Sequence, residues 1–498
     1  MRTVLFPHST AQNSQALAIT DLSESRTWIE LEDRIHQLAQ HLSVDLHVGA
    51  GDHIALLIGN RIEFVESVLA GMLCGAWVTP INTHLTAAEI SYICDDSNAT
   101  VVLSDSRHIH LLGDSNARRL INVETLCDLS AAKAVENTSP AGGTMVYTSG
   151  TTGRPKGVKR AKPDTVSQML ERMRQLGATF GFRGAGPHLV TGPMYHAAPG
   201  LFAIYDLLNG APMVIMPKWD CDTFFTAVRD FQVTTTHLVP TMFVRLLEAK
   251  DNMATAIDIT SLRYVMHGAA PISQRVKKAM IDWWGPILVE YWGASESGVI
   301  TLVTSEEWRD HPGTVGRAIA NFDVFVGDDQ GEPSDAPEGM LFARHRHLEQ
   351  VFEYHGDLEK TRKAHPKPSV FCLGDIGRVD AQGFVYLSDR ESNMIISGGV
   401  NIYPQEVEDR LMEIECIQDI CVFGVEDDEW GEQVKALIQL AHDCPPNELT
   451  IERIQREARE KIAAFKIPRL VQFVDQIPRT PTGKVIMRDI KSAYGRVN

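Results

Sequence analysis

Short, nearly continuous apolar runs recur along this chain and alternate with stretches of helical length. Helix-like stretches such as 63–76 and 222–231 lie between several of the runs. Strands that are apolar on both faces and separated by helices are typical of the parallel sheets of α/β proteins. In such folds, ligands bind at the carboxyl ends of the strands. The strand-like runs span residues 53–58, 100–104, 188–192, 212–216, 234–239 and 286–293.

The texture of the sequence changes after residue 310, where strands become shorter and turns become acidic and rich in Gly and Pro. This predicts a small antiparallel or barrel-like subdomain. Beyond residue 390, a smaller α+β unit is expected, with helices over 404–414 and 450–465 and strands over 420–425 and 434–440. We therefore expect an N-terminal domain over residues 1–390 and a C-terminal domain over 391–498.

The last of these helices carries two further local predictions. Thr450 is expected to be its N-cap, because a hydroxyl can accept a hydrogen bond from the first turn. Ion pairs are expected between Glu452 and Arg456 and between Glu457 and Lys461, which are spaced i, i+4.

Composition excludes several classes of protein. A formal net charge of -17 argues against a nucleic-acid partner, since phosphates are neutralised by excess Lys and Arg. The eight cysteines form no CxxC or Cys/His cluster, which favours reduced thiols in a cytoplasmic protein. The most apolar region, 189–217, is interrupted by His196 and Asp206, so no integral membrane segment is expected. The oligomeric state is left open.

The stretch "YTSGTTGRPKG" (147–157) has the composition of a phosphate-binding loop. Its hydroxyls can donate hydrogen bonds, its glycines let the backbone wrap around phosphates, and Lys156 adds charge. Pro155 stands where a hydrolysing P-loop needs glycine, and no GxGxxG follows a strand. A flexible surface turn is the alternative. The candidate binding residues are Thr148, Ser149, Gly150, Thr151, Thr152, Gly153 and Lys156.

Five further motifs follow this loop in a fixed order. With the loop, they make the chain, from about residue 25 to 490, resemble the acyl-adenylate-forming superfamily, and most closely its stand-alone acyl- and aryl-CoA synthetases. The resemblance implies two half-reactions: a carboxylate attacks the α-phosphate of MgATP, and the thiol of coenzyme A then displaces AMP. It thus implies ATP, Mg²⁺ and CoA. The motifs are "GAAPIS" (268–273), "EYWGASESG" (290–298), "GDIGRVD" (374–380), "SDRESNMIISGGVNIYPQEVE" (388–408) and "PRTPTGK" (478–484).

The resemblance also implies a role for each motif on the nucleotide side. Glu296 would ligate Mg²⁺, a hard cation that prefers oxygen ligands. Asp375 and Arg390 would bind the ribose hydroxyls, and the loop would hold the β- and γ-phosphates, with Thr152 among the catalytic groups. Tyr291 would stack on the adenine. Gly268, Ala269 and Ala270 would line the adenine on its other side, and Trp292 and Gly293 are further candidate cofactor-binding residues.

The C-terminal motifs are implied to serve one half-reaction each. Lys484 would bridge the carboxylate and the α-phosphate while charge builds up. After the domain rotates about a hinge that follows Arg390, the hairpin 397–401 would bring Gly398 and Gly399 to the pantetheine arm. Two departures from the family pattern are Leu373, where threonine is usual, and Ser392, where Asp or Lys is usual.

The acid is the least specified substrate. The segment 192–208 resembles the wall of the acid pocket, with His196 as its gate, although a buried structural histidine is the alternative. No Asp next to an aromatic is present to hold an ammonium, so a fatty, alicyclic or aromatic acid is favoured over an α-amino acid. A ligase that transfers the acyl group to an amine or carrier protein stays open. A non-catalytic nucleotide-binding protein is disfavoured because Lys484 and Glu296 are both retained.

Overall fold

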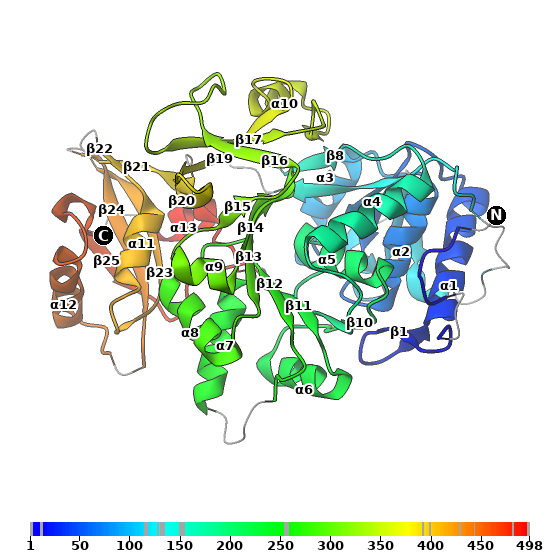
Figure 1. Ribbon diagram of the computed structural model, residues 1–498, viewed down its shortest axis with the longest axis horizontal. Helices are drawn as coiled ribbons and strands as arrows, with labels where there is room; N and C mark the ends of the chain where they lie inside the picture. The colour runs from blue at the N-terminus through cyan, green and yellow to red at the C-terminus, as the bar shows by residue number, and fades with distance from the viewer. Residues whose placement is uncertain are drawn as a thin grey trace.

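The chain folds into a large α/β N-terminal domain and a smaller C-terminal domain (Figure 1). This confirms the expected fold class. The computed structural model describes residues 3–9, 13–113, 118–126, 129, 135–148, 155–252, 258–390, 393–397, 400–427, 430–442, 444–480 and 483–495.

A seven-stranded sheet forms one half of the N-terminal domain, in the order β18-β8-β7-β4-β3-β5-β6. The strands from β7 to β6 pair in parallel, while β8 and β18 pair antiparallel at one edge. Helix α2 connects β3 to β4, and α3 connects β4 to β5. The bounds are β3 (His53–Leu57), α2 (Ile62–Leu73), β4 (Trp77–Pro80), α3 (Ala87–Asp96), β5 (Val101–Ser104), β6 (Arg119–Asn122), β7 (Gly143–Thr148), β8 (Lys156–Arg160) and β18 (Phe352–Tyr354).

A thirteen-stranded sheet forms the other half, in the order β16-β17-β19-β20-β15-β14-β13-β12-β11-β9-β10-β1-β2. Strands β13, β12, β11, β9, β10 and β1 pair in parallel. The strands from β14 to β16 pair antiparallel, as expected for the region after residue 310, and they continue the same sheet. The bounds are β1 (Leu17–Thr20), β2 (Ser25–Thr27), β9 (His188–Val190), β10 (Met213–Ile215), β11 (Thr235–Leu238), β12 (Tyr264–His267), β13 (Leu288–Ala294), β14 (Gly298–Thr304), β15 (Gly316–Ala318), β16 (Phe322–Val326), β17 (Gly339–His345), β19 (Val370–Val379) and β20 (Phe384–Arg390).

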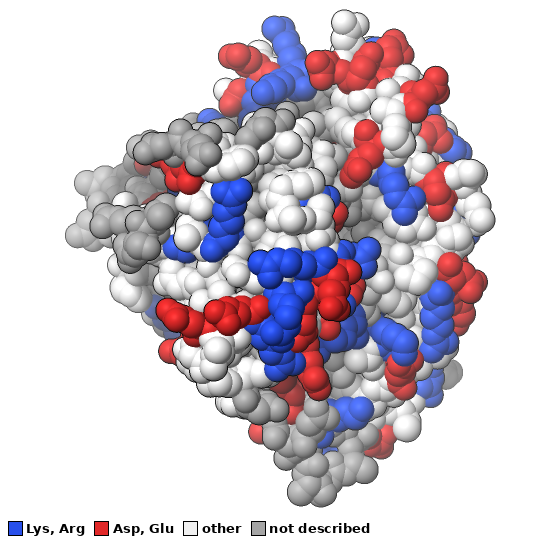
Figure 2. Space-filling model, turned by 90° about the vertical axis from the view of Figure 1, so that its left-hand side faces the viewer, with Lys and Arg blue, Asp and Glu red and all other residues white. Residues whose placement is uncertain are grey.

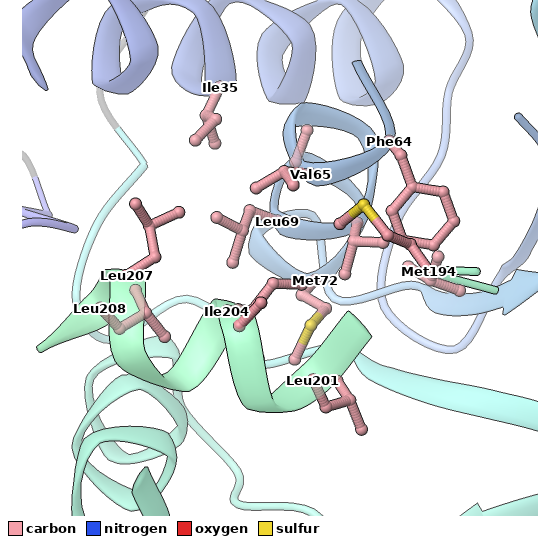
Figure 3. Packing of buried hydrophobic residues seen from close by; sticks show 14 of the residues in the cluster. Ile35, Phe64, Val65, Leu69, Met72, Met194, Leu201, Ile204, Leu207 and Leu208 are labelled. Carbon is pink, nitrogen blue, oxygen red and sulfur yellow. The ribbon is translucent and has the colours of Figure 1, made fainter. Parts of the chain in front are cut away.

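One hydrophobic cluster joins the two sheets through the helices between them. Helix α2 is buried along its whole length, as expected for a helix that is apolar on nearly every side. Figure 3 shows Leu69 and Met72 of α2 pointing toward Ile204 of α5, while Phe64 lies beside Met194. The remaining helices of this domain are α1 (Trp28–Gln40), α4 (Val166–Thr179), α5 (Ala197–Leu208), α6 (Cys221–Phe231), α7 (Pro240–Asn252), α8 (Gln274–Trp284), α9 (Ser305–Asp310) and α10 (Leu358–Ala364).

The C-terminal domain has a five-stranded sheet and hydrophobic clusters of its own. Its antiparallel β23 and β24 form the centre, and β25 pairs in parallel with β24. The bounds are β21 (Ile395–Ser397), β22 (Val400–Ile402), α11 (Pro404–Leu411), β23 (Ile417–Asp427), β24 (Gly431–Leu440), α12 (Glu448–Arg459), β25 (Leu470–Phe473) and α13 (Met487–Tyr494).

Two local predictions for α12 were wrong. The helix begins two residues before Thr450, and Asn447 is its N-cap because its side chain accepts a hydrogen bond from the Thr450 amide. Glu457 pairs with Arg453 at 2.8 Å, one turn before it. Lys461, which lies just beyond α12, pairs instead with Glu413, which lies just beyond α11, at 2.8 Å. A partner from another segment therefore replaces the i, i+4 partner.

Charged side chains of both signs and free thiols are found in the described part of the chain. Lys/Arg and Asp/Glu side chains are interspersed on the face that carries the C-terminal domain (Figure 2). The seven described cysteines are free thiols. In the described part of the chain, no helix combines the length and apolarity that a membrane span requires.

Candidate active site

Both sheets and the C-terminal domain line one cavity of about 2720 Å³. The parallel strands of the large sheet end at this cavity, as expected for an α/β fold. Ten of the residues predicted from the motifs line it. These are Thr148, His196, Ala269, Ala270, Tyr291, Trp292, Gly293, Glu296, Asp375 and Arg390, and Lys484 joins them from the C-terminal domain.

The centre of the predicted phosphate loop, residues 149–154, lies outside the described residues, and so do Gly398 and Gly399. The flanks of the loop are described: Thr148 ends β7 and pairs with Lys156 at the start of β8. Asp96 of α3 fixes the two flanks of the loop. It accepts a hydrogen bond from the Tyr147 hydroxyl at 2.7 Å and lies 3.9 Å from the Lys156 ammonium. Lys156 does not line the cavity, although Thr148 does.

Strand β13 carries two adjacent aromatic residues that point to different neighbours, because side chains alternate along a strand. Tyr291 is buried, packs edge-on against Phe202 and lies 3.3 Å from His237 through its hydroxyl. A Cβ on Gly268 would meet the Tyr291 ring at 2.6 Å, so only glycine fits there. Trp292 points instead toward Asp375, to which its indole N–H donates a hydrogen bond of 3.0 Å.

Asp375 organises the polar end of the cavity. Its Oδ2 accepts from Trp292, and its Oδ1 accepts from Arg390 Nε at 3.0 Å. The carboxylate is nearly buried, while about half of the Arg390 side chain stays exposed. Asp375 raises the pKa of Arg390 more than burial lowers it, so this guanidinium is firmly charged. The two predicted ribose-binding residues thus meet, one from β19 and one from the end of β20.

Glu296 follows β13 and faces the same cavity. Its Oε1 accepts a hydrogen bond from the Tyr354 hydroxyl at 3.2 Å, and among the described residues Oε2 has no donor. Burial, and then Glu296, raise the pKa of Tyr354, so its hydroxyl keeps its proton. A single half-free carboxylate fits Mg²⁺, which takes one or two carboxylates together with phosphate oxygens and water. Tyr354 lies on edge strand β18 and belongs to no motif, so sequence reasoning missed it.

Lys484 reaches the cavity from a turn that is fixed within the C-terminal domain. The Thr480 amide donates to the Lys484 carbonyl at 2.8 Å, and the Lys484 amide donates to the Thr480 hydroxyl at 3.1 Å. Arg479 braces the turn by donating to the Gly483 carbonyl at 3.0 Å and to both carboxylate oxygens of Asp419.

The side chain of Lys484 interacts electrostatically with Arg390, Glu296 and Asp375, which lie in the other predicted motifs. Desolvation by the cavity walls lowers its pKa, and Arg390 lowers it further, while Glu296 and Asp375 raise it. Residues far apart in the sequence are therefore close enough to interact electrostatically. The domains are docked in the orientation that brings Lys484, rather than the hairpin of β21 and β22, to this end of the cavity.

His196 lines the cavity directly before the first residues of α5. It is the N-cap of α5 but makes no capping hydrogen bond with its side chain, and its buried Nε2 has no partner among the described residues. Burial, followed by Lys484 and His84, lowers the pKa of His196 to about 3. The imidazole is therefore neutral, and an unpartnered ring nitrogen faces this site.

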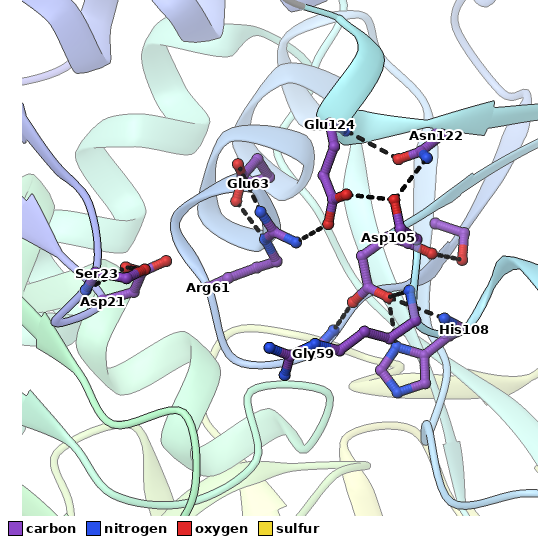
Figure 4. Close-up of polar contacts among 12 residues, drawn as sticks. Asp21, Ser23, Gly59, Arg61, Glu63, Asp105, His108, Asn122 and Glu124 are labelled. Atoms are coloured by element: carbon purple, nitrogen blue, oxygen red, sulfur yellow. Dashed lines mark hydrogen bonds and ion pairs between the residues drawn. The ribbon is translucent and has the colours of Figure 1, made fainter.

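A separate polar cluster closes the carboxyl ends of β3, β5 and β6 (Figure 4). Arg61 donates to both oxygens of Glu63, at 2.6 and 3.1 Å, and also to Glu124. Burial alone would lower the pKa of Arg61, but the two carboxylates raise it overall. Asp105 accepts from the Gly59 amide at 2.9 Å and contacts His108 at 2.6 Å. These groups satisfy one another, so the cluster fixes loops beside the cavity.

Comparisons with known proteins agree with this geometry. The pattern of the AMP-binding enzyme family matches residues 6–352, and that of the AMP-binding enzyme C-terminal domain matches residues 406–484. The chain belongs to the AMP-binding enzyme family, and its resemblance to the acyl-adenylate-forming superfamily is confirmed.

Several characterised relatives match nearly the whole chain. Long-chain-fatty-acid–CoA ligase FadD13 of Mycobacterium tuberculosis is 29% identical over 462 residues, which cover 90% of this chain and 89% of that protein. Feruloyl-CoA synthase of Amycolatopsis sp is 29% identical over 502 residues, covering 99% and 98%. A 3-[(3aS,4S,7aS)-7a-methyl-1,5-dioxo-octahydro-1H-inden-4-yl]propanoyl:CoA ligase of Rhodococcus jostii is 30% identical over 510 residues, covering 94% of each.

Solved structures share the fold at lower identity. ATP-bound MatB from Rhodopseudomonas palustris has a TM-score of 0.85 at 24% identity, covering 99% of each chain. Anthranilate CoA ligase AuaEII, in complex with anthranoyl-AMP, has a TM-score of 0.85 at 23% identity, covering 97% of this chain and 95% of that one. Amide bond synthetase McbA from Marinactinospora thermotolerans has a TM-score of 0.82 at 23% identity, covering 97% and 98%.

Proposed function

We propose that this protein is an AMP-forming acyl-CoA ligase that activates a hydrophobic carboxylic acid through an acyl-adenylate. The observation that carries the proposal is the meeting of Lys484 with Glu296, Asp375 and Arg390 in one cavity, next to the apolar wall that begins at His196. The full-length relatives support a CoA ligase, since the three compared above are named CoA ligases or a CoA synthase.

Adenylation requires an anionic carboxylate to approach a polyanion, so the site must neutralise repulsion. Lys484 would lie between the incoming carboxylate and the α-phosphate, where its ammonium stabilises the charge that develops during attack. Glu296 would hold Mg²⁺, which when bound shields the phosphate oxygens. Thr148 and Lys156 flank the loop that would hold the β- and γ-phosphates.

The nucleoside would bind at the polar end of the cavity. Asp375 accepts hydrogen bonds from Trp292 and Arg390. Its oxygens would also accept hydrogen bonds from the ribose hydroxyls, either in addition to these or in their place. The indole of Trp292 lies next to Asp375, whereas Tyr291 packs toward Phe202 and His237. These contacts favour Trp292 as the ring that stacks on the adenine and Tyr291 as a wall of the acid pocket.

Coenzyme A is the proposed acyl acceptor. The hairpin formed by β21 and β22 would deliver the pantetheine arm after a rotation of the C-terminal domain, and we place the domain boundary and the hinge directly after Arg390. Transfer to an amine is the alternative, because one structural neighbour is an amide bond synthetase. That protein shares only the fold at 23% identity, whereas the closer full-length relatives named above use CoA.

The test is mass spectrometry of products formed from MgATP and a pool of hydrophobic acids, with and without CoA. We expect AMP and an acyl-CoA when CoA is present, and a bound acyl-adenylate when it is absent. Accumulation of the acyl-adenylate regardless of CoA would retain the adenylation and reject CoA as the acceptor. Failure of every acid to yield an adenylate would reject the proposed function.

A further inference from the structure

Helices α4 and α5 line the apolar part of the cavity with one face each. Leu201, Phe202 and Tyr205 of α5 are spaced i, i+1, i+4 and all line it. His196 and Tyr205 are nine residues apart, which corresponds to about 13 Å along a helix axis. The cavity wall therefore extends well beyond the reacting end. The lining residues from α4 are Met169, Arg172, Met173, Gln175, Leu176 and Thr179.

Two arginines stand at the far end of this wall. Arg172 of α4 donates to the Ala161 carbonyl at 3.0 Å and interacts electrostatically with Tyr205. Arg160 ends β8, and its NH1 lies 2.7 Å from the position that a Cβ on Gly298 would occupy. Both side chains are half-buried and line the cavity. Glu296 lines the same cavity, so the arginines belong to the same chamber as the reacting groups.

Neither guanidinium has a carboxylate partner among the described residues. Desolvation lowers the pKa of Arg172, and Arg160 lowers it further, with only Tyr205 acting in the opposite direction. His345 lies close by, and its Nδ1 accepts from the amides of His347 and Leu348 at 3.1 and 3.0 Å, so it supplies no negative charge. Two adjacent, partly desolvated cations without a counterion are unfavourable in the free protein.

An anionic ligand would remove this penalty, because a guanidinium binds a carboxylate through charge-assisted and often bidentate hydrogen bonds. The cavity also has an apolar and aromatic lining, which includes Phe180, Phe202, Met173 and Leu176. We propose that the acid substrate carries a second carboxylate at its far end, held by Arg160 and Arg172, with a hydrophobic body between the two carboxylates. This rests on the proposed function and narrows its substrate class.

The test compares acids that differ only at the far end. Saturated monoacids and their α,ω-diacids, of about eight to fourteen carbons to span the ~13 Å wall, are assayed for adenylate formation. Wild-type protein is expected to show a diacid-to-monoacid ratio of kcat/KM of about ten or more. Arg172→Met and Arg160→Met should each lower that ratio about tenfold, as expected for a lost hydrogen bond to a charged group, and Arg172→Lys should retain part of it. The ratio is internal to each variant, so partial misfolding does not change it.

Arg229→Met provides the matched control, because Arg229 is exposed on α6 and pairs only with its neighbour Asp230. It should leave the ratio unchanged. Monoacids activated as well as diacids by wild-type protein, or a diacid preference that survives in the double Arg160/Arg172 variant, would overturn the inference and leave the ligase function standing. No adenylate from any acid would overturn both.

Discussion

Lys484 and the groups it faces lie in different domains, yet they share one electrostatic environment. Arg390 opposes its charge, whereas Glu296 and Asp375 favour it. A cation held in this balance can bind a new anion at little cost. We therefore assign Lys484 to the adenylating half-reaction alone.

Lys484→Ala is expected to slow adenylate formation by about 10²–10³-fold, as for other groups that stabilise developing charge. Thioester formation from supplied acyl-AMP and CoA should be nearly unaffected. Lys461→Ala is the control, because Lys461 pairs with Glu413 on the surface of the same domain. Equal loss of both half-reactions would contradict the assignment.

Substitutions of the two aromatic residues of β13 should each change the KM of a different substrate. Trp292→Leu should raise KM for ATP about tenfold, since stacking on a base contributes about 1–3 kcal/mol. Tyr291→Leu should instead change KM for the acid, because its ring packs with Phe202 and His237. Steady-state adenylation kinetics with each substrate varied in turn measure both effects. If Tyr291→Leu produced the larger effect on ATP, the roles proposed here would be reversed.

The pH dependence of adenylation follows from the same residues. Lys484 acts as a cation, and its pKa is lowered, so kcat/KM should be retained at lower pH and fall as pH rises, before the ordinary lysine value of about 10.4. Lys484→Arg should move the alkaline fall of kcat/KM to higher pH. With a pKa of about 3, His196 should contribute no limb near neutral pH. An alkaline limb that is identical in the arginine variant would exclude Lys484 as its source.

At the scale of elements, Gly483 lies against the start of α7, directly before Lys484. Gly483 has a φ of 77°, and a Cβ there would meet the Thr241 hydroxyl at 2.5 Å. The turn thus approaches α7 more closely than any other residue type allows.

Gly483→Ala should reduce adenylation at least tenfold through this clash and through backbone strain, while leaving the CoA half-reaction largely intact. Gly483→Ala combined with Thr241→Gly should recover part of the loss, which both half-reaction assays would detect. Gly383→Ala is the matched control, since Gly383 has a φ of 83° with open space around it. An equal loss in that control would mean that domain docking is not involved.

At the scale of the whole molecule, polar contacts between the described parts of the two domains include two on α7 and α8. Gln418 of β23 donates to Glu248 of α7, and Arg275 of α8 donates to the Ile417 carbonyl at 3.5 Å. Individual polar contacts such as these can be broken and remade, as the proposed rotation for the second half-reaction would require.

Gln418→Glu places two like charges at this contact and should slow adenylation about two- to fivefold, the effect of about 0.5–1 kcal/mol at an exposed site. The rate of thioester formation from acyl-AMP should be equal or higher. Exchanging the partners, with Gln418→Glu and Glu248→Gln together, should restore adenylation. No difference between the single and the exchanged variant would show that this contact does not bias the orientation.

The sequence alone determined the fold class and the family, and it predicted the groups that we propose bind the nucleotide. Buried parallel strands require continuous apolar runs, and phosphate chemistry requires hydroxyls, glycines and a cation, so both leave local patterns. The apolar runs 53–58 and 234–239 became β3 and β11. Asp375, Arg390 and Glu296 lie in motifs whose residues suit phosphate chemistry.

The tertiary structure alone decided which neighbours each side chain has. It directed Trp292 rather than Tyr291 toward Asp375, because strand alternation fixes the face only once the sheet is assembled. It brought Tyr354 to Glu296 and Arg160 beside Arg172, and it selected the domain orientation that presents Lys484. These contacts join segments far apart in the chain, and no local pattern encodes such a pairing.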